Sequence, residues 1–296
     1  MRVLPVVAIL VFALLAAHPT AAHAVTQTGG PTVRLADSTS VPLELPDGRA
    51  VISVALNGRG PYRLAVETGS PDVLLSPKAV AELGLRATGM GDGDSVFRLD
   101  SLRIGAALIG SLPVGRDAAF ERIGVDGVLG LVAYQELLLT LDYPGQRLSL
   151  ARGTLPPPDG RDVLAATRVG PFIGIPVVFG GVRETGVIDT QGGTGFQATE
   201  AVASQLVFQG PLRVVGRVVV GHGVPVELRM GVLQGDARLG GHLIHQPRIA
   251  VHPLPPDIPS RVTIGLDVLR HFILAIDQRT MAVRLTRPDT AAIALD

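Results

Sequence analysis

The sequence predicts an all-β protein built from two related halves. Apolar residues make up 47% of the chain, but only 4% of residues are aromatic and Trp is absent, so the core consists mainly of Val, Leu, Ile and Ala. The 36 Gly and 23 Pro residues imply many turns, which again favours strands over helices. A third observation, an internal repeat, predicts the two halves, and 296 residues leave room for a core in each.

Charge and cysteine content exclude several classes of function. The 26 basic and 26 acidic residues give no net charge, and no basic run is present, so we expect no nucleic-acid partner. The chain has no Cys, which excludes disulfides, a thiol nucleophile and a lipoprotein anchor.

Residues 1–24 are typical of a signal peptide. Arg2 precedes an apolar run over 3–17, and Ala22–His23–Ala24 is a small-x-small cleavage site. The run is short for a membrane span, so we expect none after cleavage. The sequence therefore predicts an exported bacterial protein, periplasmic or secreted, and the alternative is that this segment stays as an anchor.

The first half is expected to contain short strands joined by tight turns. Residues 25–40 are polar and predict a loose lead-in. Apolar residues alternate over 51–56, Asn57–Gly58 predicts a hairpin turn, and 62–66 continues as the next strand. A further strand is predicted at 73–75.

Each half also predicts one short helix after its third strand. In the first half Ser76 is the predicted N-cap, Pro77 the first helical residue, and Gly84 the residue just past the end. In the second half Thr199 is expected to cap a helix over 200–206.

The second half repeats the order of the first. A strand over 173–179, a turn at Gly180–Gly181 and a strand over 185–188 lead to Asp189–Thr190, as the strand over 62–66 leads to Glu67–Thr68. The alignment predicts one extra residue after Thr190, Gln191, with Gly192 in the place of Gly69.

The ends of the two halves match as well. Asp126–Leu131 and Leu139–Tyr143 reappear as Val262–Leu269 and Leu274–Asp277, and one offset relates both pairs. We interpret this constant register as the result of a duplication.

These landmarks divide the chain. We expect an N-terminal lobe over 41–152, a linker over 153–170, a C-terminal lobe over 171–287 and a tail over 288–296. The linker contains three consecutive prolines, which suit an extended segment and exclude a central strand.

The repeated motif resembles one lobe of an aspartic protease. An acid and Thr after an apolar strand, followed later by Val128–Leu129–Gly130, is similar to the bacterial retropepsin-like and pepsin-like proteases. The resemblance covers about 45–152 and 170–287. It implies a bilobal fold of two related β-barrel lobes with short helices and a cleft between them.

The resemblance implies that Glu67 and Asp189 are the catalytic acids. Two close carboxyl groups share one proton; the charged member draws a proton from water, and the protonated member polarises the peptide carbonyl. This chemistry needs no cofactor or metal, and the expected substrate is an extended peptide or protein. Because one chain supplies both acids, we expect a monomer. The expected supporting residues of the two loops are Thr68, Gly69, Ser70, Thr190, Gln191 and Gly192.

Two departures from the family motif leave an alternative open. Glu67 stands where the family has Asp, and its extra methylene moves the carboxyl group by about 1 Å, which can cost on the order of 10²-fold in rate. Gln191 interrupts the second Asp–Thr–Gly triplet. Either the pair still catalyses hydrolysis, or the protein is an impaired relative that binds a peptide or partner protein in the same cleft.

A hairpin that covers the cleft is expected in each half at a glycine-rich tip. The alternative is an ordinary mobile hairpin tip. The candidate residues are Gly91, Asp92, Gly93, Gly221, His222 and Gly223.

Other motifs are weaker. Asp92–Ser95 resembles the start of a calcium loop but lacks the later ligands. His242, His245 and His252 have no acidic partner at ligand spacing, so we expect hydrogen-bonded or surface histidines.

Overall fold

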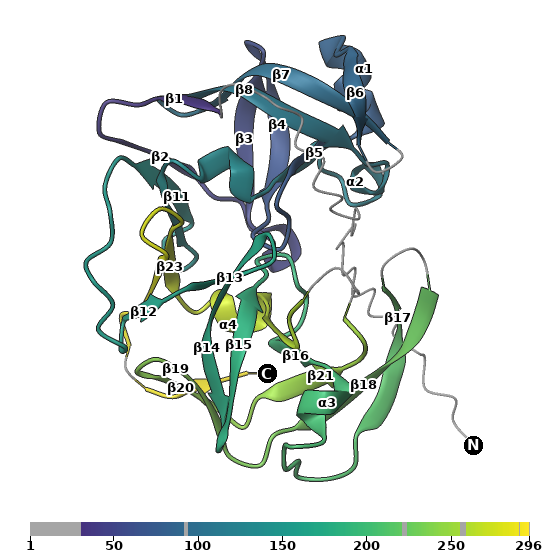
Figure 1. The fold of residues 1–296 in the computed structure, drawn as a ribbon, viewed down its shortest axis with the longest axis vertical. Coiled ribbons are helices and arrows are strands. Elements are labelled where there is room, and N and C mark those ends of the chain that lie inside the picture. Colours follow the sequence, from purple (N-terminus) through teal and green to yellow (C-terminus); the bar gives the residue numbers. More distant parts are fainter. Residues whose placement is uncertain (1–30, 92–93, 221–223, 255–258, 290, 296) are drawn as a thin grey trace.

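The computed structural model describes residues 31–91, 94–220, 224–254, 259–289 and 291–295. The predicted signal peptide lies outside these ranges. In Figure 1 the first half of the chain lies above the second, and strands make up most of both. The predicted all-β, bilobal fold class is confirmed. Within the described residues, no helix has the length and apolar character needed to cross a membrane.

Strands of the first half close into a barrel. The sheet order is β1-β8-β5-β9-β4-β3-β7-β6, and an additional pairing between β7 and β8 joins the six central strands into a ring. The strands of this sheet are β1 (Thr32–Arg34), β3 (Val51–Leu56), β4 (Arg59–Val66), β5 (Val73–Leu75), β6 (Ala87–Gly91), β7 (Asp94–Ile104), β8 (Ala107–Arg116) and β9 (Gly127–Leu129).

The second half forms a curled half-barrel with the same central order. Strands β21-β16-β22-β15-β14 correspond to β8-β5-β9-β4-β3, with parallel and antiparallel neighbours at the same places. The half-barrel stays open: β18 pairs with β21 as β7 pairs with β8, but β14 pairs with β19 and, among the described residues, not with β18. The strands are β13 (Thr167–Val169), β14 (Phe172–Phe179), β15 (Val182–Ile188), β16 (Phe196–Ala198), β17 (Arg213–Val220), β18 (Val224–Val232), β19 (Asp236–Leu239), β20 (His242–His245), β21 (Arg248–Val251), β22 (Val262–Ile264) and β25 (Ile293–Ala294).

A third sheet, of six strands, joins the halves. Its order is β12-β24-β23-β10-β11-β2, and equivalent strands of the two halves meet at its centre, where Leu139 pairs with Ile276 and Leu141 with Leu274. Buried residues of both halves form one continuous apolar cluster. The strands are β2 (Ser38–Pro42), β10 (Leu138–Asp142), β11 (Arg147–Ala151), β12 (Val163–Ala165), β23 (Ile273–Asp277) and β24 (Ala282–Thr286).

The first predicted helix forms as expected and the second is shorter. In α1 (Pro77–Leu83), Ser76 Oγ accepts a hydrogen bond from the Ala79 N–H at 3.1 Å, and Gly84 adopts a left-handed φ of 63°. Helix α3 covers only Glu200–Ala203, and the Thr199 side chain makes no capping bond. The other helical segments are η1 (Pro46–Gly48), α2 (Ala119–Arg122), η2 (Leu131–Tyr134) and α4 (Leu266–Leu269).

The three segments predicted as a loose lead-in, an extended linker and a tail contain strands. The lead-in contributes β1 and the start of β2, which pair with β8 and β11. Within 153–170, β12 and β13 pair with β24 and β14. In the tail, β25 pairs with β20 and Ile293 is 2% exposed. In each case a strand that is distant in the sequence or belongs to another element supplies the hydrogen-bonding partner, and a local sequence pattern does not contain that information.

Candidate active site

The two predicted acids lie at equivalent strand ends. Glu67 follows β4, and its N–H donates to the carbonyl of Leu129 in β9 at 3.0 Å. Asp189 follows β15, and its N–H donates to the carbonyl of Ile264 in β22 at 2.9 Å. In each half the acid therefore leaves the sheet beside the parallel strand that follows later in the chain.

Two buried threonines connect the acid loops. The Thr68 N–H donates to Thr190 Oγ1 at 3.0 Å, and the Thr190 N–H donates to Thr68 Oγ1 at 3.2 Å. Each hydroxyl in turn donates to a carbonyl of the opposite half, Thr68 to Ile188 at 2.7 Å and Thr190 to Val66 at 2.8 Å. The two loops are thus related by a local twofold axis, and the acids that precede the threonines are neighbours.

Asp189 is held between two glycines and two backbone donors. A Cβ atom on Gly69 would lie 2.8 Å from Asp189 Oδ1, and one on Gly192 would lie 2.7 Å from Oδ2. The N–H groups of Gln191 and Gly192 donate to Oδ1 at 3.1 and 2.9 Å. These contacts favour the ionised carboxylate and hold it in one place.

Glu67 occupies a different environment. No hydrogen bond from a described residue reaches its carboxylate, and the Gly69 N–H does not take the supporting role that the resemblance implied. The side chain lines a cavity of about 10 Å³, about enough for one water molecule. The other lining residues are Arg49, Ala65, Phe120, Ile123, Val128 and Gln191, several of which belong to a small apolar cluster.

Burial raises the pKa of both acids, but hydrogen bonds from described residues oppose this effect only at Asp189. Each is 3% exposed. Burial raises the pKa of Glu67 well above its usual range, and the charge of Asp189 adds to the effect, then that of Asp117, while Arg49 opposes it. Burial also raises the pKa of Asp189, but the two backbone N–H groups act against it. The two N–H donors therefore favour the ionised form of Asp189, and burial without such donors from a described residue favours the protonated form of Glu67.

Hydrogen-bond register corrects the alignment of the two loops. The Leu131 N–H donates to the carbonyl of Ser70 at 2.9 Å, and its counterpart in the second half, the Leu266 N–H, donates to the carbonyl of Gly192 at 2.8 Å. Gly192 therefore corresponds to Ser70, not to Gly69.

Gln191 is thus the counterpart of Gly69 and not an extra residue. The extra residue of the second half falls later, between this loop and β16, because β5 and β16 are offset by one residue more than the loops. The Gln191 amide nitrogen reaches across to the first half, where it donates to the carbonyl of Val66 at 3.0 Å and contacts that of Ala50 at 3.4 Å.

The predicted covering hairpins correspond to β6–β7 and β17–β18. Gly91 ends β6 and pairs with Asp94. Met90, the residue before it, is 70% exposed. The remaining candidates, Asp92, Gly93, Gly221, His222 and Gly223, lie outside the described residues.

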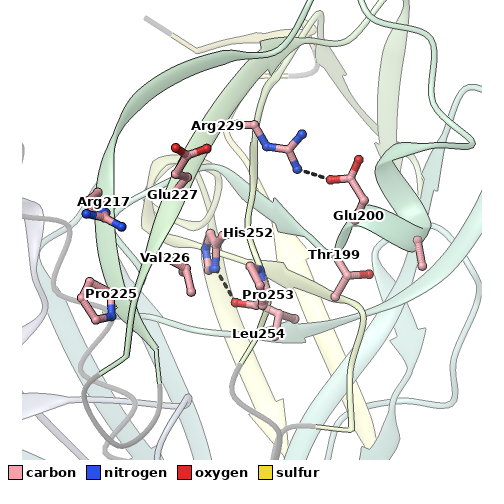
Figure 2. Close-up of a pocket in the computed structure, with 11 residues that line it drawn as sticks. Thr199, Glu200, Arg217, Pro225, Val226, Glu227, Arg229, His252, Pro253 and Leu254 are labelled. Atoms are coloured by element: carbon pink, nitrogen blue, oxygen red, sulfur yellow. Dashed lines mark hydrogen bonds and ion pairs between the residues drawn. The ribbon is translucent and has the colours of Figure 1, made fainter.

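A groove that the sequence did not reveal lies between the β17–β18 hairpin and α3 (Figure 2). Its volume is about 740 Å³. Arg229 and Glu200 form an ion pair at its edge. Its lining residues are Thr199, Glu200, Ala201, Arg217, Pro225, Val226, Glu227, Arg229, His252, Pro253 and Leu254. The strand pattern of 213–232 predicts the hairpin, but the groove arises only where the hairpin faces α3.

His252 connects this groove to the Asp189 loop. The ring is 4% exposed; Nδ1 lies 2.7 Å from the Pro253 carbonyl and Nε2 lies 3.0 Å from Gln197 Oε1. A Cβ atom on Gly192 would lie 3.4 Å from the Gln197 amide nitrogen. One buried side chain therefore separates the groove from the loop that holds Asp189.

The other two histidines considered as metal ligands, His242 and His245, also make hydrogen bonds. His242 Nε2 lies 2.9 Å from the carbonyl of Leu285, and His245 Nδ1 lies 2.8 Å from Asp236 Oδ1. The part of the chain that the structure describes contains no group of three or more His, Asp or Glu side chains placed to hold a metal ion.

Comparison with known proteins supports the fold. No protein-family model and no curated protein sequence matches this chain. An aspartic proteinase from Irpex lacteus is 15% identical, with a TM-score of 0.54 over 86% of this chain and 98% of its own. A retropepsin-like aspartic protease from Rickettsia conorii is 18% identical, with a TM-score of 0.31 over 41% of this chain and 94% of its own. The chain therefore has the bilobal fold of the pepsin-like aspartic proteinases.

Proposed function

We propose that this protein is an exported aspartic-type endopeptidase that uses Glu67 and Asp189. The observation that carries the proposal is the reciprocal hydrogen bonding of Thr68 and Thr190, which makes neighbours of two buried acids from distant parts of the chain. Buried neighbouring carboxyl groups that share one proton provide an acid and a base in one site.

The two acids take different roles. The carboxylate of Asp189 accepts a proton from the attacking water, while protonated Glu67 donates a hydrogen bond to the peptide carbonyl oxygen. The tetrahedral intermediate then collapses as the amine leaves with a proton, and the pair returns to its singly protonated state. Two backbone donors on Asp189 and none from a described residue on Glu67 support this assignment.

The proposed substrate is an extended peptide between the lobes. The groove beside the β17–β18 hairpin offers room for residues of the peptide beyond the scissile bond, and it presents both arginine and glutamate side chains. Because one chain supplies both acids, the proposed active form is a monomer.

The burial of the acids favours a second candidate, a protein that binds peptides without cleaving them. Glu67 and Asp189 are each 3% exposed, and the cavity beside Glu67 is small. In that case the groove would bind a peptide or partner protein, and the acid pair would be a structural remnant.

Cleavage of a mixed peptide library by the mature protein, followed by mass spectrometry from pH 3 to 7, separates the two. Endopeptidase activity should appear at acidic pH and disappear in both Glu67→Gln and Asp189→Asn. Glu136→Gln, at an exposed site, should retain it. Peptide binding without cleavage at any pH would support the second candidate, and cleavage that survives both acid substitutions would exclude the shared site.

A further inference from the structure

Gly69, the residue after Thr68 in the first acid loop, lies directly against the carboxylate of Asp189 in the second. At position 69, a Cβ atom would lie 2.8 Å from Oδ1 and 3.0 Å from Cγ of Asp189, which is closer than Cβ atoms approach such groups in proteins. Gly69 therefore leaves space for the carboxylate of the opposite loop. This position needs a residue without a Cβ.

Gln191 occupies the corresponding position in the second loop, and it has a Cβ. By the same twofold relation its Cβ projects toward residue 67. An aspartate at position 67, placed as Asp189 is placed, would put its carboxyl group within about 3 Å of that carbon, well inside the 3.5–4.0 Å of a favourable contact. With Gln191 in this place, the second loop therefore leaves no room for an Asp at position 67 arranged as Asp189 is.

Glu67 resolves this conflict through its extra methylene. The longer side chain carries the carboxyl group past the Gln191 Cβ, and both residues line the same small cavity. The hydrogen bonds are consistent with this displacement. In the second loop two N–H groups reach the carboxylate of their own acid, whereas the equivalent N–H groups of Gly69 and Ser70 make no such bond to Glu67.

The Gln191 side chain also holds the strand end that carries the acid. Its amide nitrogen donates to the carbonyl of Val66, the residue before Glu67, while its own backbone N–H donates to Asp189. The side chain is 8% exposed. One residue thus contacts the backbone at the first acid and the carboxylate of the second.

We propose that Glu67 and Gln191 are a matched pair, in which Gln191 is a positioning residue that requires the longer acid at position 67. The two departures from the family motif, Glu67 in place of Asp and Gln191 in place of Gly, then have one cause and compensate each other. The consequence for catalysis rests on the proposed peptidase function; the steric match does not.

A double-mutant cycle tests the pair with two readouts. The variants are Glu67→Asp, Gln191→Gly and the double variant, each measured by urea unfolding and by peptide cleavage. We expect Glu67→Asp alone to lower the urea midpoint and to reduce cleavage by about 10²-fold, because the acid is misplaced by about 1 Å. Adding Gln191→Gly should raise the midpoint above that of Glu67→Asp and restore cleavage at least tenfold, although Gln191→Gly alone lowers both.

A matched control removes a glutamine side chain elsewhere. Gln209 is exposed, so the effects of Glu67→Asp and Gln209→Gly should be additive. Additive midpoints in the Glu67–Gln191 cycle as well would overturn the matched pair. If the wild-type protein cleaves no peptide, the proposed function fails, and the urea cycle still decides whether the two residues are matched.

Discussion

Replacing Glu67 by glutamine should stabilise the protein increasingly as pH rises. The substitution keeps the shape of the side chain and removes the carboxyl group of a residue that is 3% exposed. Burial, followed by the charge of Asp189, raises the pKa of Glu67 well above its ordinary value of 4.5. The folded protein therefore keeps a proton that the unfolded chain releases.

The sign and size follow from this difference in bound protons. The stability associated with protonated Glu67 is fully present below about pH 4.5 and is lost as pH rises toward the folded-state pKa. One extra bound proton changes the free energy of unfolding by about 1.4 kcal/mol per pH unit. For each pH unit between the ordinary and the folded-state pKa of Glu67, the Glu67→Gln variant should therefore gain up to about 1.4 kcal/mol over the wild type.

Urea unfolding at half-unit intervals from pH 4 to 7 measures this gain. Glu136→Gln is the matched control, because its side chain is exposed; its difference from the wild type should stay within about 0.5 kcal/mol at every pH. A pH-independent difference for Glu67→Gln would refute the reasoning, since it would mean that the folded protein holds no extra proton at this site.

Two further substitutions test other parts of the structure. Gln191→Met keeps the volume of the side chain but loses its amide hydrogen bonds to two carbonyls of the first half, each of which keeps another donor. We therefore expect urea unfolding to show a stability loss of only about 0.5–1.5 kcal/mol, and none for the exposed control Gln209→Met. A stability loss above about 3 kcal/mol would contradict this reasoning. Ile293→Ala, in the tail strand, truncates a residue that is 2% exposed and should lower the free energy of unfolding by at least about 2 kcal/mol in thermal unfolding. The control Val207→Ala, at a site that is 64% exposed, should change stability little. Equal effects would mean that the tail does not contribute to the core.

Local patterns were sufficient for the fold class, the first helix and the identity of the two acids. Alternating apolar residues predict strands wherever one face is buried, and the Ser76, Pro77 and Gly84 signals act within a single helix turn. The acid–Thr motif appears twice at the same place in a repeated order of elements. A reader of the sequence can therefore pair Glu67 with Asp189 before any contact between them is known.

The alignment of Gln191 needed the structure. Both alignments of the second loop leave a glycine near the acid, so residue types alone do not separate them. The hydrogen bond from Leu266 to the carbonyl of Gly192 does, because its counterpart joins Leu131 to Ser70. That register turns an apparent insertion into a substitution at a position where, in the first loop, a Cβ atom would meet the opposite acid.

By itself, the sequence determined that the chain is all-β, that its two halves repeat one order of elements, and which two acids correspond. Those features depend on neighbours within a few residues and on repetition along the chain. The tertiary structure alone decided that β10 and β23 join the halves in one sheet, that the second barrel stays open, and that Gln191 reaches toward the first acid. Each of these depends on which distant groups complete a hydrogen bond or fill a space, and the local sequence does not specify that choice.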